Sequence, residues 1–568
     1  MHRFEEFQVL VIASAAKLRA QLHAMLPAFG FAVTHFAISA RTALRHLRAR
    51  RYELILCDYA LEGGQDGQRL LEDLRQHEII ARETLFVMIT GERNYECVLG
   101  AAELLPDDYI LTPLVAGALR ERLMRIADRR EAFLPAWRLS AAGDWLGAID
   151  YCLRAQGEYP HYLVDFHRLE AELYIAAGQV DEAGEIYRQI IAAQRIPWAR
   201  LGLARCLALK KEHAEADALL AGLIAEHTHF MAAYDLLARV RAASGQDREA
   251  CEILCAAIER SPYRLERQRQ LGELAMEAGE AATAETALAE VVRQSAHSGF
   301  RNPEDHVRLV RAQLAQGKAD AARATIGDLE RNPGSPPGTA LCTALASAML
   351  HAHTGDTAQA RASIAAAAKL TAAGVAAFSP RLAREMVRIC FDQGLEEMGS
   401  EMAANILRAT SDEQTMLALR EMLRTRGLGP LSKKIEQNIQ EEVRRLIMAG
   451  AEKARIGDYG GAVAAMTQAV RQMPGHPVVL FNAALALLRH IEHRGWNDAL
   501  AHQARALIER ARALDPASGR LAMLAEFMHL LIERDGIAVH EAPPARRRAR
   551  LNRSRAVQAE KDVRARKS

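Results

Sequence analysis

The chain of 568 residues lacks the features that mark several protein classes. Its eight cysteines lie far apart except for Cys251 and Cys255, so the sequence has no paired-disulfide framework. No apolar run approaches the roughly 18 residues that a membrane-spanning helix needs. Aromatic residues make up only 5% of the chain. We therefore expect a cytoplasmic protein with reduced thiols and no membrane partner.

Motifs of the common enzyme classes are also missing. The sequence has no glycine-rich phosphate loop, no nucleophile elbow and no zinc-protease helix. Cys251 and Cys255 could share one helix face, but no histidine or acidic cluster accompanies them, so we interpret them as small core residues. We therefore expect no enzyme and no catalytic residue.

Positive charge is concentrated at one end of the chain. The formal net charge is only +2, yet residues 541–568 hold ten basic residues against three acidic ones. This composition, after Pro543 and Pro544, predicts a basic disordered tail. Such a tail could neutralise phosphates, which leaves a nucleic-acid-associated regulator as one alternative function. The tail contains no aromatic residue to stack on bases, which argues against that alternative.

The first 130 residues alternate short apolar runs with helical patterns. The runs lie at residues 9–12, 31–33, 54–57, 85–89 and 109–111. This alternation predicts a doubly wound parallel sheet, and the continuous apolar character of the runs indicates that helices cover both faces. Ligands of such sheets bind beyond the carboxyl ends of the strands.

Asp58, Thr90 and Thr112 stand at those carboxyl ends. Together with the stretches 57–67 and 107–109, they resemble the receiver domains of response regulators, over about residues 4–130. The resemblance implies a flavodoxin-like fold and a place in two-component phosphorelay signal transduction. It also implies that Asp58 is the phosphoacceptor, that the Thr90 hydroxyl contacts the phosphoryl group, and that Tyr109 is the aromatic switch residue.

The sequence departs from that family at three positions. Ala13 and Ser14 replace the acidic pair after the first strand, and Thr112 replaces the lysine after the fifth. Phosphoryl transfer to a carboxylate needs a divalent cation and positive charge on the transferred group. Mg²⁺ prefers carboxylate oxygens, which neither a methyl nor a hydroxyl group replaces. We therefore expect a degenerate receiver that binds no metal.

Two alternatives stay open for this site. Glu62 or another nearby acid could rebuild a weak magnesium site. The protein would then be a phosphorylation-competent response regulator, with Asp58 as its phosphoacceptor and Mg²⁺ as its cofactor.

From about residue 131 the pattern becomes helical and repeats itself. Small residues recur in pairs twelve apart, and successive pairs follow 33 or 34 residues on: Ala171 and Ala183, Ala204 and Ala216, Ala238 and Ala250, Gly272 and Ala284. This period is typical of tetratricopeptide repeats, and the small residues let paired helices approach closely. The sequence therefore predicts an all-α tetratricopeptide-like solenoid after the α/β domain.

We expect four segments: a receiver-like domain at 1–130, repeats at 131–430, further repeats at 431–540 and the tail at 541–568. Stacked repeats form a concave groove that holds a peptide or a helix of another protein. Asn482 is a candidate groove residue. Our leading hypothesis is a signalling scaffold that binds other proteins through the groove and through the receiver surface.

Overall fold

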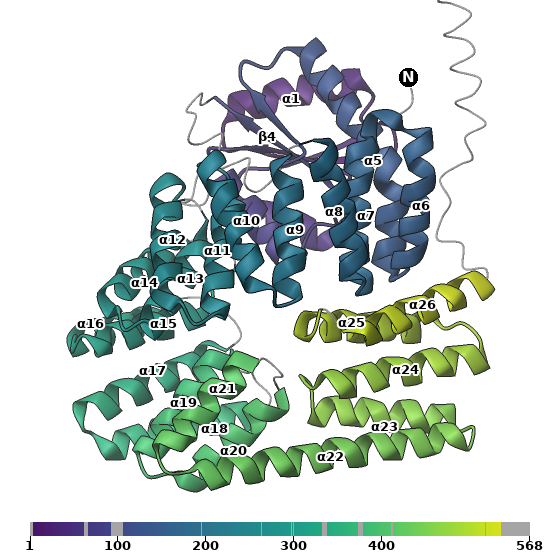
Figure 1. The fold of residues 1–568 in the computed structure, drawn as a ribbon. Coiled ribbons are helices and arrows are strands. Elements are labelled where there is room, and N and C mark those ends of the chain that lie inside the picture. The colour runs from purple at the N-terminus through teal and green to yellow at the C-terminus, as the bar shows by residue number, and fades with distance from the viewer. Residues whose placement is uncertain are drawn as a thin grey trace, which may run out of the picture.

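The structure is a computed structural model that describes residues 4–535 apart from 62–65, 92–105, 195, 263, 297, 299, 332–337, 373–378, 410–412 and 517. It contains an N-terminal α/β domain and a long array of helices (Figure 1). The α/β domain is built from β1 (Gln8–Ile12), α1 (Ala16–Phe29), β2 (Val33–Ala37), α2 (Ala40–Ala49), β3 (Leu54–Asp58), α3 (Gly67–Gln76), β4 (Leu85–Thr90), β5 (Asp108–Leu111) and the first part of α5 (Ala116–Ala142).

The five strands form one parallel sheet in the order β2-β1-β3-β4-β5. Alternate side chains of each strand point to opposite faces, so Val9 and Val11 pack with α1 and α5, while Leu10 and Ile12 pack with α2 and α3. Both faces are therefore covered, which confirms the fold expected for this domain.

The second strand differs from its predicted position. The apolar pattern placed it at residues 31–33, whereas β2 runs from Val33 to Ala37 and includes Thr34 and His35. Because β2 lies at the edge of the sheet, the side chains from Thr34 to Phe36 are only partly buried and its polar residues are tolerated.

The helix α5 joins the two parts of the molecule without a linker. It has 27 residues, and its buried positions change from Leu119 and Leu123 under the sheet to Phe133 and Ala136 in the helical array. Residue 130, where the receiver-like domain was expected to end, lies in the interior of this helix. A continuous helix fixes the orientation of the first helices of the array relative to the sheet.

The array continues as antiparallel helices joined by short turns. Its first half contains α6 (Trp145–Glu158), the 3₁₀ turn η1 (Pro160–Tyr162), α7 (Leu163–Ala177), α8 (Val180–Ala193), α9 (Pro197–Leu209), α10 (His213–Glu226), α11 (Met231–Ala243), α12 (Asp247–Arg260), α13 (Leu265–Glu277), α14 (Ala281–Ser295), α15 (Pro303–Ala315) and α16 (Ala319–Glu330). The second half contains α17 (Thr339–Thr354), α18 (Thr357–Ala372), α19 (Pro380–Asp392), α20 (Glu396–Ala409), α21 (Glu413–Thr425), α22 (Gly429–Arg455), α23 (Tyr459–Gln472), α24 (Pro477–Arg494), α25 (Asp498–Leu514) and α26 (Gly519–Arg534).

The small residues of the repeat pattern lie where paired helices touch. Ala204 on α9 and Ala216 on α10 are fully buried. At Gly272 on α13, an added β carbon would lie only 2.5 Å from Cγ of Leu288 on α14, so no larger residue fits there. The predicted helix pairs are thus present, and their assignment to the tetratricopeptide family stays a prediction.

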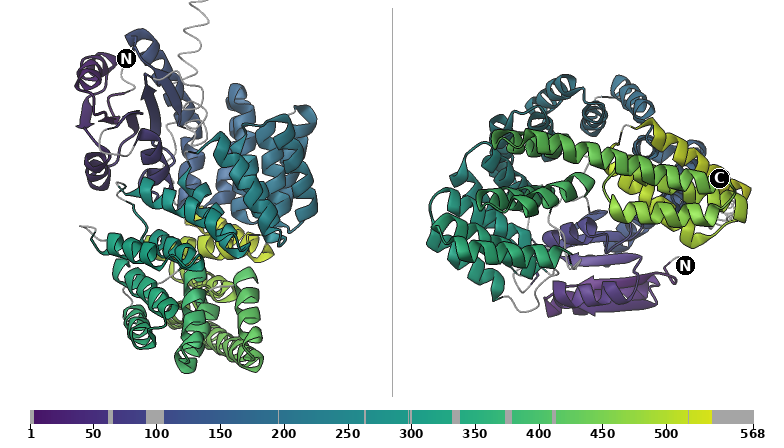
Figure 2. Two further views of the ribbon diagram at one scale, coloured as in Figure 1. Left: turned by 90° about the vertical axis from the view of Figure 1, so that its left-hand side faces the viewer. Right: turned by 90° about the horizontal axis from the view of Figure 1, so that it is seen from below.

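The array closes on itself. One buried cluster combines Phe133, Trp145 and Phe166 from its start with Leu488 and Met528 from its end. Figure 2 shows these last helices, in yellow, beside the first ones. Arg512 on α25 donates to the carbonyl oxygen of Ala176 at 2.8 Å, and His529 on α26 lies 2.7 Å from Oδ1 of Asp144.

The N-terminal domain also contacts the array away from α5. Ser298, in the loop between α14 and α15, donates to Oδ2 of Asp73 at 2.7 Å, and Phe300 stacks on His77 with ring centroids 4.3 Å apart. Arg82 forms an ion pair of 2.8 Å with Glu172 on α7. Among the described residues, no helix has the length and apolar character needed to cross a membrane.

Candidate functional site

The predicted site residues gather at the carboxyl edge of the sheet. Asp58 ends β3, Thr90 ends β4, and the amide of Thr112 donates to the carbonyl oxygen of Thr90 at 2.8 Å. The hydroxyl oxygen of Thr112 lies 3.2 Å from the position that a β carbon on Gly91 would take. The structure thus brings Thr90 and Thr112 together, next to the strand that carries Asp58.

Asp58 is half-buried at this edge. Its Oδ1 accepts a hydrogen bond from the amide of Ala60 at 3.3 Å. Burial raises the pKa of Asp58, and the hydrogen bond from Ala60 partly offsets that effect. Helix α3 begins directly against this strand, because a β carbon on Gly67 would lie 2.4 Å from the carbonyl oxygen of Asp58. Only glycine fits at that position.

The loop after β1 contains Ala13 and Ser14, which replace the acidic pair of the receiver family. Hydrogen bonds hold this loop in place. Nη1 of Arg19 on α1 donates to the carbonyl oxygens of Ala13 and Ser14, at 2.7 and 2.5 Å. The Ser14 hydroxyl donates to the carbonyl oxygen of Ala60 at 3.0 Å. The carbonyl oxygens of Ala13 and Ser14 therefore already have a donor, and Arg19 fixes the path of the loop.

This arrangement limits the chemistry of the site. Asp58 contributes a carboxylate, whereas Ala13 is fully buried and contributes only a methyl group. In the part of the chain that the structure describes, no three histidine, cysteine, aspartate or glutamate side chains are grouped so that they could hold a metal ion. Glu62, which was the candidate for a rebuilt site, lies outside the described residues.

The acidic residues before Tyr109 serve the packing of β5. Oδ2 of Asp107 accepts from the amide of Phe86 at 2.7 Å, which places it near the amino end of β4 and away from Asp58. Burial raises the pKa of Asp107, and the hydrogen bond from Phe86 and the charge of Arg75 oppose that shift. Asp108 accepts two hydrogen bonds from Arg122 on α5. Tyr109 itself packs against the cluster between the sheet and α3.

Comparison with known proteins identifies the domain. A family model described as the response regulator receiver domain matches residues 9–124. Residues 9–124 form a receiver domain. This receiver is 28% identical over 125 residues to the chemotaxis protein CheY-3 of Vibrio cholerae. The alignment covers 22% of this chain and 95% of that protein. It is 25% identical over 122 residues to the chemotaxis protein CheY of Pseudomonas aeruginosa. That alignment covers 22% of this chain and 97% of that protein.

Solved structures match a share of the chain of the same size. A two-component response regulator from Clostridium difficile is 22% identical and covers 22% of this chain and 98% of that chain, with a TM-score of 0.20. NtrX from Brucella abortus is 28% identical and covers 22% of this chain and 27% of that chain, also with a TM-score of 0.20. The family match and the two curated relatives confirm the receiver resemblance predicted from the sequence, and they support a role in two-component signalling.

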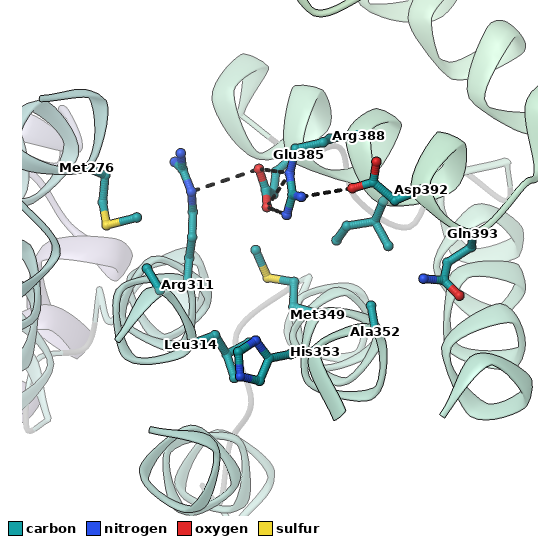
Figure 3. Close-up of a pocket in the computed structure, with 12 residues that line it drawn as sticks. Met276, Arg311, Leu314, Met349, Ala352, His353, Glu385, Arg388, Asp392 and Gln393 are labelled. Carbon is teal, nitrogen blue, oxygen red and sulfur yellow. Dashed lines mark hydrogen bonds and ion pairs between the residues drawn. The ribbon is translucent and has the colours of Figure 1, made fainter. Parts of the chain in front are cut away.

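A second candidate site lies in the array, between α13, α15, α17 and α19 (Figure 3). This pocket has a volume of about 390 Å³. Nε of Arg311 lies 3.9 Å from Glu385, and Nη1 of Arg388 lies 2.9 Å from Asp392. Burial alone would raise the pKa of Glu385, but hydrogen bonds and charge from Arg388 and the charge of Arg311 outweigh it, so that pKa is lowered. The charges of the pocket thus largely satisfy one another.

The other candidate residues from the sequence that the structure describes make contacts within the fold. Asn482 donates to the carbonyl oxygen of Val478 on its own helix at 2.7 Å. Cys251 is buried, Cys255 is partly buried, and burial raises the pKa of both thiols. The basic tail lies outside the described residues. Sequence reasoning missed Arg19, whose only signal was its position one turn into the helix after β1.

Proposed function

We propose that the protein is a signalling scaffold without catalysis of its own, located in the cytoplasm. Its receiver acts as a fixed docking module that does not carry out Mg²⁺-dependent phosphoryl transfer, and its helical array holds another protein. The observation that carries this proposal is the composition of the carboxyl edge, where Asp58 ends β3 and Ala13, which follows the neighbouring strand β1, contributes only a buried methyl group.

The electrostatics of the receiver edge support this proposal. A divalent cation would have to bind with the Asp58 carboxylate alone, because Ala13 and Ser14 offer no carboxylate where the receiver family has its acidic pair. The transferred phosphoryl group would also lack the ammonium that stabilises its charge, because Thr112 offers only a hydroxyl. The missing carboxylates and the missing ammonium would each slow phosphoryl transfer to Asp58, and both destabilise the same transition state.

The attachment of the receiver supports a scaffold role. The receiver is held by the continuous helix α5, by the contacts of Ser298 and Phe300 with the region of α3, and by the ion pair of Arg82 with Glu172. Because the receiver is joined to the array at several places, it moves little relative to the array. It instead presents its free surface in a fixed orientation relative to the array.

A second candidate function is a working phosphorelay regulator. It is favoured by Asp58, which keeps the position and the partial exposure that a phosphoacceptor needs at the carboxyl edge of the sheet. In that case phosphorylation would shift the receiver surface, and α5 would carry the change into the array. A third candidate, nucleic-acid binding through the basic tail, has the net charge of residues 541–568 as its only support.

Magnesium binding separates the first two candidates. The full chain and an Asp58→Asn variant are titrated with MgCl₂ in a calorimeter. The scaffold proposal predicts identical heats for the two proteins up to millimolar Mg²⁺. Saturable binding to the native chain that disappears in Asp58→Asn would overturn the proposal and favour the phosphorelay candidate.

A further inference from the structure

One stretch of the receiver carries no negative charge. Residues 7–52 contain seven lysines and arginines and no aspartate or glutamate. The rest of the domain has the opposite balance, because residues 53–130 contain fifteen acidic and nine basic residues. The charges are therefore segregated within the domain, and the stretch without acids covers β1, α1, β2 and α2.

Helix α2 presents three of these arginines on one face. Arg41, Arg45 and Arg48 are exposed and follow one another in steps of four and three residues, which places them in a row along one side of the helix. The opposite side packs into the receiver through Leu44 and Leu47, which are buried. The row therefore faces solvent, and the β carbons of successive arginines are roughly 5–6 Å apart.

Local hydrogen bonds fix both ends of this helix. The amide of Ser39 donates to Oγ1 of Thr42 at 3.0 Å, and the amide of Thr42 donates to Oγ of Ser39 at 3.4 Å, which forms a capping box. At the other end, Nη1 of Arg50 donates to Nε2 of His35 on β2 at 2.8 Å. The positive charge thus continues from α2 onto the edge strand of the sheet.

The arginines of this face lack carboxylate partners. Within the part of the chain that the structure describes, no ion pair is formed by Arg41, Arg45, Arg48, Arg50 or Arg51.

Exposed arginines of the array are paired instead, as Arg154 is with Asp150 at 3.0 Å. Helix α2 packs on β1 and β2, and Figure 2 (left) shows the first helices of the receiver, in dark purple, on the side turned away from the array. The α2 face is therefore open to a partner.

The chemistry of the α2 face distinguishes between classes of partner. Its exposed side chains are arginines and Ala49, and the exposed Ile38 lies before the helix. The centre of a protein–protein interface is depleted of charge and enriched in aromatic residues, which this face does not offer. Interfaces with nucleic acid are more polar and much more positively charged. The face thus fits a phosphate polymer better than an acidic protein.

We propose that the α2 face of the receiver binds the phosphate backbone of a nucleic-acid duplex through Arg41, Arg45 and Arg48. Planar guanidinium groups bind phosphate oxygens through paired hydrogen bonds. A duplex holds its phosphates in a regular row, and contacts to them fix the position of a protein without reading the base sequence. This inference goes beyond the proposed scaffold function, because its partner is not a protein.

The test measures binding of the full chain to a fluorescein-labelled DNA duplex of mixed sequence, by fluorescence anisotropy between about 50 and 200 mM salt. The variant Arg41→Glu, Arg45→Glu, Arg48→Glu should bind at least tenfold more weakly at the lower salt concentration. Its plot of log affinity against log salt should be flatter by about 3, since each phosphate contact contributes about 0.9 to the slope. Any contribution of residues 541–568 is common to both proteins and cancels in this difference.

Two further variants separate the site from general charge and from misfolding. Arg154→Glu, Arg323→Glu, Arg455→Glu makes the same change in net charge at side chains of the array that are 72%, 63% and 72% exposed, and it should keep the native slope. Arg41→Lys, Arg45→Lys, Arg48→Lys keeps the charge of α2 and should also keep the slope. An RNA duplex of the same sequence, measured in the same way, shows which polymer the face prefers.

Four results would overturn the inference. They are no binding of either duplex by the native chain, an unchanged slope in the glutamate variant of α2, an equal loss in the variant of the array, and tighter binding of poly-glutamate than of a duplex of equal charge. The last result would indicate an acidic protein as the partner. The magnesium titration concerns Asp58 and none of these arginines, so the scaffold proposal and this inference fail separately.

Discussion

The Ser298 hydroxyl donates to the carboxylate of Asp73 across 225 residues of sequence, at 2.7 Å. This bond joins the loop between α14 and α15 to α3 of the receiver. Phe300 follows in the same loop and stacks on His77 at an interplanar angle of 11°. The loop between α14 and α15 therefore contacts the receiver through Ser298 and Phe300.

Removing the ring of Phe300 should loosen this docking. The stacked pair is expected to contribute about 1 kcal/mol beyond the area it buries. In Phe300→Ala, amides of α3 should exchange with deuterium roughly five times faster, as measured by mass spectrometry of the full chain. The His77→Ala, Phe300→Ala cycle should show coupling between the two residues. Additive effects would mean that the rings do not stabilise each other.

Glu72 makes the same interface sensitive to pH. It lies on α3 with its side chain 11% exposed, 4.0 Å from Arg264 of the array. Burial raises the pKa of Glu72 from 4.5 to about 7, with Arg264 and Arg269 lowering it and Asp73 and Glu266 raising it. The folded protein therefore binds the Glu72 proton more tightly than the unfolded chain does.

The free energy of unfolding should accordingly fall as pH rises from about 4.5 to about 7, by up to about 3 kcal/mol from this group. Urea denaturation of Glu72→Gln should lack that part of the slope, and the variant should be more stable than the native chain at pH 8. Glu185→Gln, on the surface of α8, is the control and should retain the slope. An unchanged slope in Glu72→Gln would show that Glu72 is not the responsible group.

Substitutions at two glycines should distinguish the stability cost of backbone strain from the cost of disturbing the contact between the first and last helices of the array. Gly178 and Gly245 both end a first helix with positive φ, at 83° and 76°. A β carbon on Gly178 would lie 2.7 Å from Cβ of Leu521 on α26, whereas nothing lies within 4 Å of one on Gly245. Gly245→Ala should cost about 1 kcal/mol from strain, and Gly178→Ala roughly 1–3 kcal/mol more. Equal thermal destabilisation would contradict the close approach of α26.

The sequence predicted those features that local patterns carry. Continuous apolar runs located the strands, since both faces of the sheet are buried, and β2 was misplaced because an edge strand tolerates Thr34 and His35. The spacing of small residues located the helix pairs, because a β carbon at Gly272 would collide with Leu288. The departures at Ala13, Ser14 and Thr112 identified what the receiver edge lacks.

Long-range contacts could not be predicted in this way. The bond from Arg512 to the Ala176 carbonyl spans 336 residues, and neither residue has a sequence neighbourhood that indicates the other. The role of Arg19 was also missed, since an arginine in the first helix is ordinarily a solvated surface residue. Its two carbonyl acceptors become evident only from the path of the loop after β1.

If the missing charges account for an inactive receiver, restoring them should restore the reaction. The triple variant Ala13→Asp, Ser14→Asp, Thr112→Lys supplies two carboxylates for Mg²⁺ and an ammonium for the phosphoryl group. It should acquire a Mg²⁺-dependent phosphoryl adduct that disappears when Asp58→Ala is added. A folded triple variant without any adduct would show that other features block the reaction.

Incubation of the full chain with acetyl phosphate, with and without Mg²⁺, followed by intact-mass spectrometry, tests the central claim most directly, and Asp58→Ala is its control. The account predicts the same mass for the native chain and the control under both conditions, apart from the substitution itself. A Mg²⁺-dependent phosphoryl adduct on the native chain that is absent from Asp58→Ala would contradict the account and restore a phosphorelay mechanism.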